Sequence, residues 1–241
     1  MNTFPLSNLL LLDIETVPCH ERFEMLPDEL KLLWGDKISK TVPESLTLDE
    51  SYLLRAGIMA EFGKIICISA GYFYEDENNQ VCFKVKSVCC EEESEILQNF
   101  LTITDGFLKS KKHIVFGGHN IREFDIPYIC RRLLINNIPL PSYLQLHAAK
   151  PWEIEMIDTM QWWKFGDYKN YISLNLLATI LNVPSSKNDI DGSKVRDVYY
   201  EHKDIQRIAT YCEKDVIVVA NIILRFKNQP LLKEENIQII K

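Results

Sequence analysis

Two acidic side chains, Asp13 and Glu15, directly follow the apolar run at residues 9–12. Residues two apart in a β-strand point to the same face, so a strand here presents the two carboxylates side by side. Adjacent carboxylates repel each other, and a cation between them allows both to stay ionised at neutral pH. The carboxyl end of a buried strand is also where ligands bind in open α/β sheets. The pair is a candidate cation site, although a solvated strand end has the same pattern.

Three further segments place an acid beside unusual neighbours. Gly117-Gly118 closes a short strand, and Asp125 falls in the first turn of the helix that follows. Tyr211 and Asp215 are four residues apart in the closing helix, so they share one helical face. Asp158 stands at another strand end, where a helix cap is a better explanation than a metal ligand. Taken alone, each segment also fits an ordinary structural role, because acids are favourable near helix N-termini.

Together, three elements far apart in the sequence supply four carboxylates, those of Asp13, Glu15, Asp125 and Asp215. Hard divalent cations such as Mg²⁺ prefer oxygen ligands and take only a few carboxylates per ion. Two such ions about 3.5–4 Å apart hold the attacking and leaving oxygens of an in-line phosphoryl displacement. The combination favours metal-assisted phosphoryl chemistry.

The elements that must position these residues predict an α/β architecture, a mixed five-stranded sheet flanked by helices. Apolar or alternating runs predict strands at residues 8–14, 64–74, 81–90, 113–116 and 154–157. Helical periodicity and capping residues predict helices over residues 27–34, 91–109, 122–135, 174–181 and 202–226. We expect residues 1–241 to form a single domain, with a surface excursion at about 36–62 whose role the sequence does not assign.

The composition bounds the class of protein. Of the 241 residues, 46% are hydrophobic and 25% are charged, which excludes a disordered chain, a collagen and a coiled coil. The chain has 27 basic and 34 acidic residues, giving a formal net charge of −7. This excess argues against a broad basic surface that coats nucleic acid. Two bound divalent cations would add four charges and leave −3, which still permits local contact with the end of one strand.

Cysteine usage and hydropathy indicate a reduced, cytoplasmic protein that does not associate with membranes. The seven cysteines are odd in number and show no C-x-x-C spacing, so a zinc ribbon or a thioredoxin-like motif is unsupported. The apolar runs at 65–74 and 216–224 are shorter than the roughly 18 residues needed to span a bilayer. Asp13 interrupts the N-terminal apolar run too early for a signal peptide.

A family resemblance connects the acidic segments. The ordered set D-I-E-T, N-x-x-x-F-D and Y-x-x-x-D resembles the three exonuclease motifs of the DEDD, or DnaQ-like, 3′–5′ exonuclease superfamily. The similarity is greatest to predicted exonucleases related to the proofreading domain of family B DNA polymerases. Segments 173–177 and 189–193 and the pair Asp158-Thr159 add to the resemblance, which runs from about residue 8 to about 225. It implies a ribonuclease H-like fold.

The resemblance also implies roles for individual residues. Asp13, Glu15, Asp125 and Asp215 would bind two Mg²⁺ or Mn²⁺ ions, with Asp13 bridging them. Tyr211 would orient the attacking water together with Glu15. The histidine subfamily has its histidine five residues before the last aspartate. Because Thr210 occupies that place here, the chain resembles the tyrosine (DEDDy) type.

Substrate contacts follow from the same motifs, with weaker candidates elsewhere. Thr16, Asn120 and Phe124 are expected to contact the terminal nucleotide, although Phe124 would serve equally well as a core aromatic. Aromatic side chains that could stack on unpaired bases, or pack in the core instead, are Trp162, Trp163, Tyr168 and Tyr171. Basic side chains that could hold phosphates are Arg122, Arg131, Arg132, Lys187, Lys194 and Arg196, of which the last three lie near the family-like segment 189–193.

The sequence therefore predicts a metal-dependent 3′–5′ exonuclease acting on the 3′ end of single-stranded nucleic acid, with no covalently linked polymerase domain. DNA is the favoured substrate, but the contact that distinguishes RNA is to the 2′-OH and has no clear sequence signal. The alternatives are an RNA-trimming exonuclease of the same fold, a non-catalytic nucleic-acid-binding protein and a structural metal-binding module. The oligomeric state is not predicted.

Overall fold

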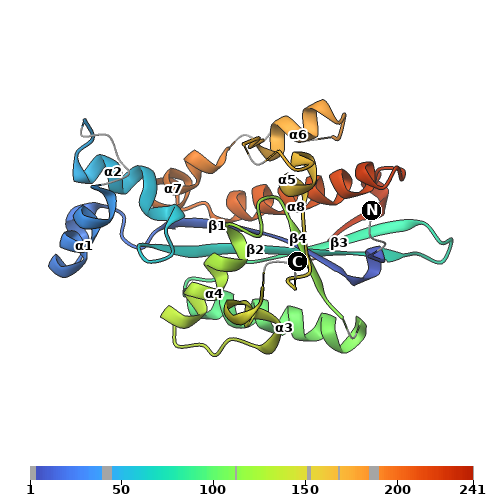
Figure 1. Ribbon diagram of the computed structural model, residues 1–241, viewed down its shortest axis with the longest axis horizontal. Coiled ribbons are helices and arrows are strands. Elements are labelled where there is room, and N and C mark those ends of the chain that lie inside the picture. The colour runs from blue at the N-terminus through green and yellow to red at the C-terminus, as the bar shows by residue number, and fades with distance from the viewer. Residues whose placement is uncertain are drawn as a thin grey trace.

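Six strands form one mixed sheet at the centre of the computed structural model, in the order β5-β4-β1-β2-β3-β6 (Figure 1). The structure describes residues 4–39, 45–111, 113–150, 153–167, 169–184 and 190–240. The strands are β1 (Leu9–Pro18), β2 (Gly63–Glu75), β3 (Val81–Val88), β4 (Val115–Gly118), β5 (Met156–Asp158) and β6 (Ile237–Ile240). Strands β1, β2 and β3 are antiparallel neighbours, whereas β4, β5 and β6 each join the sheet through a parallel pairing.

The predicted mixed α/β sheet flanked by helices is confirmed, but the expected number of five strands is wrong. The sixth strand, β6, pairs with the outer edge of β3. Its four residues, Ile237–Ile240, are too few to show a period, and they acquire strand structure from hydrogen bonds to a distant edge.

Helices cover both faces of the sheet (Figure 1). On one face lie α3 (Glu93–Lys111) and α4 (Asp125–Ile135); on the other lie α5 (Thr159–Lys164), α6 (Leu174–Ile180), α7 (Val195–Asp197) and α8 (Ile205–Phe226). Short 3₁₀ turns occur at Leu6–Asn8, Phe23–Met25, Ala56–Ile58, Ser142–Leu144, Leu146–Ala148, Gly192–Lys194 and Glu234–Asn236, and a π-helical turn at Val198–His202. Within the described ranges, no helix is both long and apolar enough to cross a membrane.

Alternation along β1 divides its side chains between the two layers. Leu10, Leu12 and Ile14 belong to the cluster shared with α3 and α4. Leu9 and Leu11 belong to a second cluster with the apolar side chains of α8. Because both faces are buried, the strand reads as a continuous apolar run in sequence.

The carboxyl half of β1 extends beyond its neighbour β4. The β1–β4 ladder involves only Leu9–Leu11, and Gly118 ends β4 beside the Leu12 carbonyl. A Cβ atom on Gly118 would lie 3.0 Å from that oxygen, so glycine permits the close approach. Among the described residues, the segment 13–18 is paired with β2 on one edge and with no strand on the other. The candidate acids of β1 therefore lie at an open edge of the sheet.

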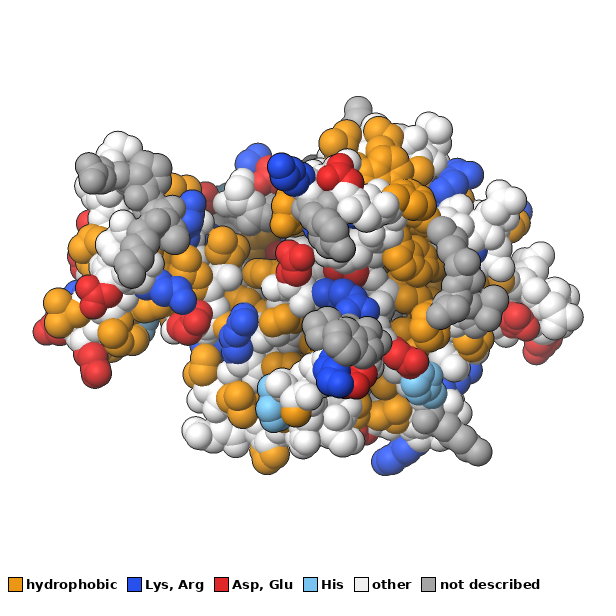
Figure 2. Space-filling model, viewed as in Figure 1, with side chains coloured by type: hydrophobic (Ala, Val, Ile, Leu, Met, Phe, Trp, Pro, Cys, Tyr) orange, Lys and Arg blue, Asp and Glu red, His pale blue; other side chains and the backbone are white. Residues whose placement is uncertain are grey.

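Two helices, α1 (Asp28–Ile38) and α2 (Leu48–Arg55), project beyond the end of the sheet and are called here the α1–α2 wing (Figure 1). They pack around their own apolar cluster, which includes Trp34, Tyr52 and Phe62. Thr47 and Glu50 form a capping box at the start of α2. The wing contains part of the predicted excursion at 36–62, of which residues 40–44 lie outside the described part of the chain. Acidic side chains are visible at its outer end in Figure 2.

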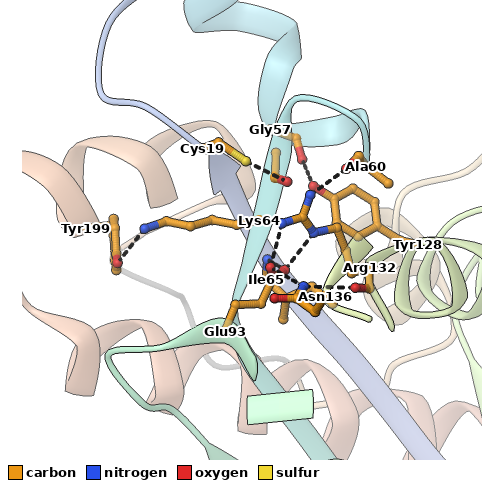
Figure 3. A network of polar contacts seen from close by, with 11 residues as sticks. Cys19, Gly57, Ala60, Lys64, Ile65, Glu93, Tyr128, Arg132, Asn136 and Tyr199 are labelled. Carbon is orange, nitrogen blue, oxygen red and sulfur yellow. Dashed lines mark hydrogen bonds and ion pairs between the residues drawn. The ribbon is translucent and has the colours of Figure 1, made fainter. Parts of the chain in front are cut away.

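A buried polar network holds α4 to β2 and α3 (Figure 3). The guanidinium of Arg132 pairs with Glu93 through Nε at 2.8 Å and Nη2 at 2.5 Å, and its Nη1 donates to the Ala60 carbonyl at 2.8 Å. Glu93 also accepts hydrogen bonds from Asn136 Nδ2 and from the Ile65 N–H. The side chains of Arg132 and Glu93 are each 8% exposed. Every charge in this network has a partner, so it fixes the orientation of α4.

Candidate active site

Asp13 and Glu15 lie on the face of β1 that is turned toward α8, as strand alternation predicts. Glu15 is buried and Asp13 is half-buried. The thiol of Cys212, on α8, lies 3.3 Å from the Asp13 carbonyl and 3.3 Å from Asp13 Oδ2. A carboxylate oxygen from each acid and the Cys212 sulfur all fall within 4.8 Å of one another. The open edge of β1 thus presents a compact set of possible metal ligands.

Asp125 reaches the same place from the opposite layer. It is the first residue of α4, so its predicted place in the first turn is confirmed, and it is 3% exposed. Its Oδ1 accepts a hydrogen bond of 3.2 Å from the backbone N–H of Ile14. Because Ile14 separates Asp13 from Glu15, this bond places Asp125 directly against the paired acids.

Tyr211 and Asp215 complete the cluster from α8. The Tyr211 hydroxyl is hydrogen-bonded to the Asp215 carboxylate, as expected for positions four residues apart on one helical face. Their helix is capped by Asp204, the residue before its first turn, whose side chain accepts from the Arg207 N–H. Both side chains of the pair are half-buried. The structure therefore brings together all five residues for which catalytic roles are predicted.

Burial and the closeness of other acids raise the pKa values of the acidic side chains in the cluster. Burial raises the pKa of Asp13, and its electrostatic interactions with Cys212, Glu15, Asp125 and Asp215 raise it further. Burial also raises the pKa of Glu15, with contributions from the same neighbours on α4 and α8. The pKa of Asp125 rises to about 7, mainly through burial, despite hydrogen bonds from its own backbone N–H and from that of Ile14.

This donor set fits a divalent cation. Its oxygen atoms are hard ligands, and a bound cation would favour the ionised carboxylates that burial and mutual repulsion disfavour. None of the ion pairs between described residues includes Asp13, Glu15 or Asp125. The residues that would hold the metal are the four carboxylates, and their ligand roles stay predictions.

The three predicted substrate contacts lie around the cluster. The Thr16 side chain is hydrogen-bonded to Tyr128, and Phe124 packs on the same Tyr128 ring with centroids 5.4 Å apart. Asn120 has a left-handed backbone, with φ of 62°, and its buried Oδ1 has no hydrogen-bond partner among the described residues. Asn120 therefore keeps an unused acceptor near the start of α4.

Asp158 is the helix cap that the sequence predicts, and it has a second role that the sequence does not show. Its carboxylate accepts from the N–H groups of Met160 and Gln161 at the start of α5. It also accepts from the N–H groups of Asn120 (3.0 Å) and Arg122 (3.2 Å). Asp158 thereby holds the loop that leads into Asp125. The separation of nearly 40 residues leaves no local signal for this contact.

Most of the weaker candidates have structural partners. Trp162 packs on Phe226, Trp163 packs against the apolar cluster of α6 and α8, and Tyr171 is exposed. The guanidinium groups of three arginines are bound within the protein: Arg122 to the carbonyls of Ile154 and Met156, Arg132 to Glu93, and Arg196 to Asp197 and Glu201. Arg131 and Lys194 are exposed, whereas Tyr168, Lys187 and Asp189 lie outside the described residues.

Cys212 is a site residue that the motif analysis misses. It immediately follows Tyr211, and its 0% exposure and its contact with Asp13 place it at the back of the acidic cluster. A buried cysteine in a helix otherwise behaves as a small apolar residue, so the sequence offers no distinguishing signal.

Comparisons with known proteins agree with the geometry. A family model described as a predicted 3′–5′ exonuclease related to the exonuclease domain of PolB matches residues 58–236. The match includes Asp125, Tyr211 and Asp215, while Asp13 and Glu15 precede it. No curated protein matches this sequence.

Among solved structures, the family B DNA polymerase of the hyperthermophilic archaeon Pyrobaculum calidifontis is similar, with a TM-score of 0.50 and 14% sequence identity. The alignment covers 90% of this chain and 24% of the polymerase, so the chain spans about a quarter of that protein's length. The likeness concerns the fold, and it confirms the predicted ribonuclease H-like architecture.

Proposed function

Because the chain belongs to the predicted 3′–5′ exonucleases related to the exonuclease domain of PolB, we propose that it is a metal-dependent 3′–5′ exonuclease. Its substrate is the 3′ end of single-stranded nucleic acid, with DNA favoured. The observation that carries the proposal is the convergence of four carboxylates and one tyrosine from β1, α4 and α8 at the open edge of the sheet.

The four carboxylates would hold two Mg²⁺ or Mn²⁺ ions, with Asp13 as the ligand common to both. The negative charge that Glu15, Asp125 and Asp215 exert on Asp13 supports this central role. When bound, two divalent ions lower the pKa of a water molecule and stabilise the leaving 3′ oxygen. Glu15 and Asp125 are buried, so their electrostatic contacts are stronger than they would be in bulk water.

Tyr211 orients the attacking water rather than removing its proton. Burial, followed by the charges of Asp215, Glu15 and Asp13, raises the Tyr211 pKa well above its ordinary value of 10. The hydroxyl consequently keeps its proton near neutral pH, donates it in the hydrogen bond to Asp215, and has lone pairs that accept a hydrogen bond from the water. Glu15, on the facing strand, accepts a hydrogen bond from the same water.

The terminal nucleotide lies against Thr16, Asn120 and Phe124. The unpartnered Oδ1 of Asn120 offers an acceptor, and the half-buried ring of Phe124 offers an apolar surface. Contact is local because the acidic chain carries a formal net charge of −7 and needs its bound cations to accept a polyanion.

The test is degradation of a 5′-labelled single-stranded DNA and a sequence-matched RNA, each with Mg²⁺, with Mn²⁺ and with EDTA. We expect a ladder that shortens from the 3′ end of the DNA and releases nucleoside monophosphates only when metal is present. A 3′-terminal phosphorothioate linkage should slow the first step. Cleavage of RNA alone would overturn the substrate preference, and binding without cleavage would overturn the catalytic proposal.

A further inference from the structure

Three thiols form a continuous chain of contacts that begins at the candidate active site. The Cys212 thiol contacts Asp13, the Cys67 thiol is hydrogen-bonded to Cys212, and Cys89 is hydrogen-bonded to Cys67. Cys67 and Cys212 have 0% exposure, whereas Cys89 is half-buried. Cys89 is therefore the end of the chain that a small solute reaches.

Strand register determines which two of these thiols can be joined. Strands β2 and β3 are antiparallel, and Ile68 of β2 lies opposite Val88 of β3. The ladder ends at this pair, and continuing the same register by one residue brings Cys89, the residue after β3, opposite Cys67; both side chains pack in the apolar cluster between the sheet and α8. Opposed Cα atoms in antiparallel strands are about 4.5–5.5 Å apart, which is within the range of about 4.4–6.8 Å for disulfides. No such register relates Cys67 to Cys212, which lie on a strand and a helix.

We propose that Cys67 and Cys89 form an oxidation site that converts to a disulfide in the presence of a peroxide. The Cys89 thiolate attacks hydrogen peroxide, the O–O bond breaks, and Cys89 sulfenic acid and hydroxide form. The Cys67 thiol then attacks that sulfur, the S–O bond breaks, and the S–S bond forms. The released oxygen leaves as water with the Cys67 proton, and hydroxide takes up the proton that Cys89 lost. Two thiols are oxidised by two electrons, and one peroxide is reduced to two waters.

The environment of Cys89 supports its role as the attacking thiol. The hydrogen bond from Cys67 lowers the Cys89 pKa, although burial opposes this shift. The half-buried cysteines Cys19 and Cys130 provide an internal comparison, because their thiols donate to the carbonyls of Gly63 and Leu144. Burial raises the pKa of both. A raised pKa leaves less of the reactive thiolate.

The disulfide would change the packing directly behind the acidic cluster. An S–S bond of about 2.05 Å is much shorter than a contact between thiols, so Cys67 moves toward Cys89 and away from Cys212. Cys212 then loses the thiol neighbour that packs it against Asp13. This inference does not depend on nuclease activity, because its primary readout is the state of the sulfur atoms.

The experiment exposes the reduced full-length protein to a series of hydrogen peroxide concentrations, alkylates the remaining thiols and digests without reduction. Trypsin with a glutamate-specific protease separates Cys67, in residues 65–75, from Cys82 and releases Cys89 in residues 87–91. We expect a linked pair of these peptides, two hydrogens lighter than their sum. It should appear at peroxide exposures about tenfold lower than those that modify Cys19 or Cys130.

Variants assign the bond to its two sulfur atoms. Cys90→Ser removes the adjacent thiol in the same peptide and should leave the linked product unchanged, whereas Cys89→Ser should abolish it. Because Cys89 is only half-buried, both variants are expected to melt near the temperature of the parent protein, and thermal melting checks this. A Cys67–Cys212 link, a link between two molecules, or a Cys89 that alkylates as freely as Cys19 throughout the series would overturn the proposal.

Discussion

Two buried clusters of charge share α4, one at its first residue, Asp125, and the other about two turns further along at Arg132, and they are built in opposite ways. The Arg132–Glu93 network neutralises each charge with a partner, and the Glu93 carboxylate accepts from a guanidinium, an amide side chain and a backbone N–H. In the acidic cluster, Asp13, Glu15 and Asp125 have raised pKa values because burial and negative neighbours act in the same direction.

This difference indicates that the Arg132–Glu93 network stabilises the fold, whereas the acidic cluster serves the proposed function. A buried charge with complete partners fixes the position of an element, and removal of one partner leaves the other uncompensated. A buried group of like charges disfavours the metal-free fold and is consistent with a site that binds an ion. The network holds α4 in place, and the acidic cluster uses that fixed position because Asp125 is the first residue of the same helix.

The largest effect is expected from Asp13→Asn, which removes the proposed bridging ligand. Loss of several kcal/mol of transition-state stabilisation corresponds to a rate at least about 10³-fold lower. The metal-free variant should be as stable as the parent protein or more stable, since one of the repelling charges is gone. Rates on labelled oligonucleotide and urea unfolding in EDTA measure the two quantities. Glu123→Gln, which changes an exposed acid in the loop before Asp125, is the matched control. Full activity of Asp13→Asn would contradict the assignment.

The opposite result is expected from Arg132→Met. The substitution leaves Glu93 buried without its cation, which costs about 3–5 kcal/mol of unfolding free energy. Arg131→Met changes an exposed neighbour on the same helix and should shift the unfolding free energy by less than about 0.5 kcal/mol. Urea unfolding in EDTA distinguishes the two. Equal effects of the two substitutions would remove the contrast between the clusters.

The pH dependence of stability sharpens the comparison further. The pKa of Asp125 is raised from 3.8 to about 7 in the folded protein, so the fold favours its protonated form. Its contribution to stability is complete below about pH 4 and is lost as the pH rises to about 7. In EDTA we expect the melting temperature to fall by several degrees across this range, and Mn²⁺ should reverse the fall at pH 7. Asp125→Asn should flatten the profile, and an unchanged slope would show that Asp125 is not the titrating group.

Local patterns were sufficient to predict the elements that carry the candidate site. The helix predicted over 202–226 is observed as Ile205–Phe226, and the strand predicted over 64–74 as Gly63–Glu75. Strand alternation places Asp13 beside Glu15, and helical spacing places Tyr211 beside Asp215. In these cases the period of the backbone alone determines which side chains are neighbours.

The remaining features depend on contacts between distant segments. Arg132 and Glu93 are 39 residues apart, and the local sequence around each gives no indication that its side chain is buried. The thiol chain joins Cys212 to Cys67 only because α8 packs over β2. The sequence predicts only the helix over 27–34 and an excursion at about 36–62 in the wing region, because the core around Trp34 and Tyr52 forms only when two helices meet. Contacts of this kind between distant segments leave no periodic pattern in the sequence from which they could be predicted.

The smallest effect is expected from Tyr211→Phe, which tests where the acidic cluster ends. The substitution removes one hydrogen bond to the attacking water and leaves all four carboxylates, so the rate should fall about tenfold. Stabilisation by Mn²⁺, measured by thermal melting, should be retained because the phenol is not a metal ligand. Tyr199→Phe, whose hydroxyl accepts from Lys64 away from the acids, is the matched control and should keep the parent rate. An unchanged rate would remove Tyr211 from the catalytic set. Parallel loss of rate and of Mn²⁺ stabilisation would instead assign the hydroxyl to positioning Asp215, which would make it a supporting contact like those around Arg132.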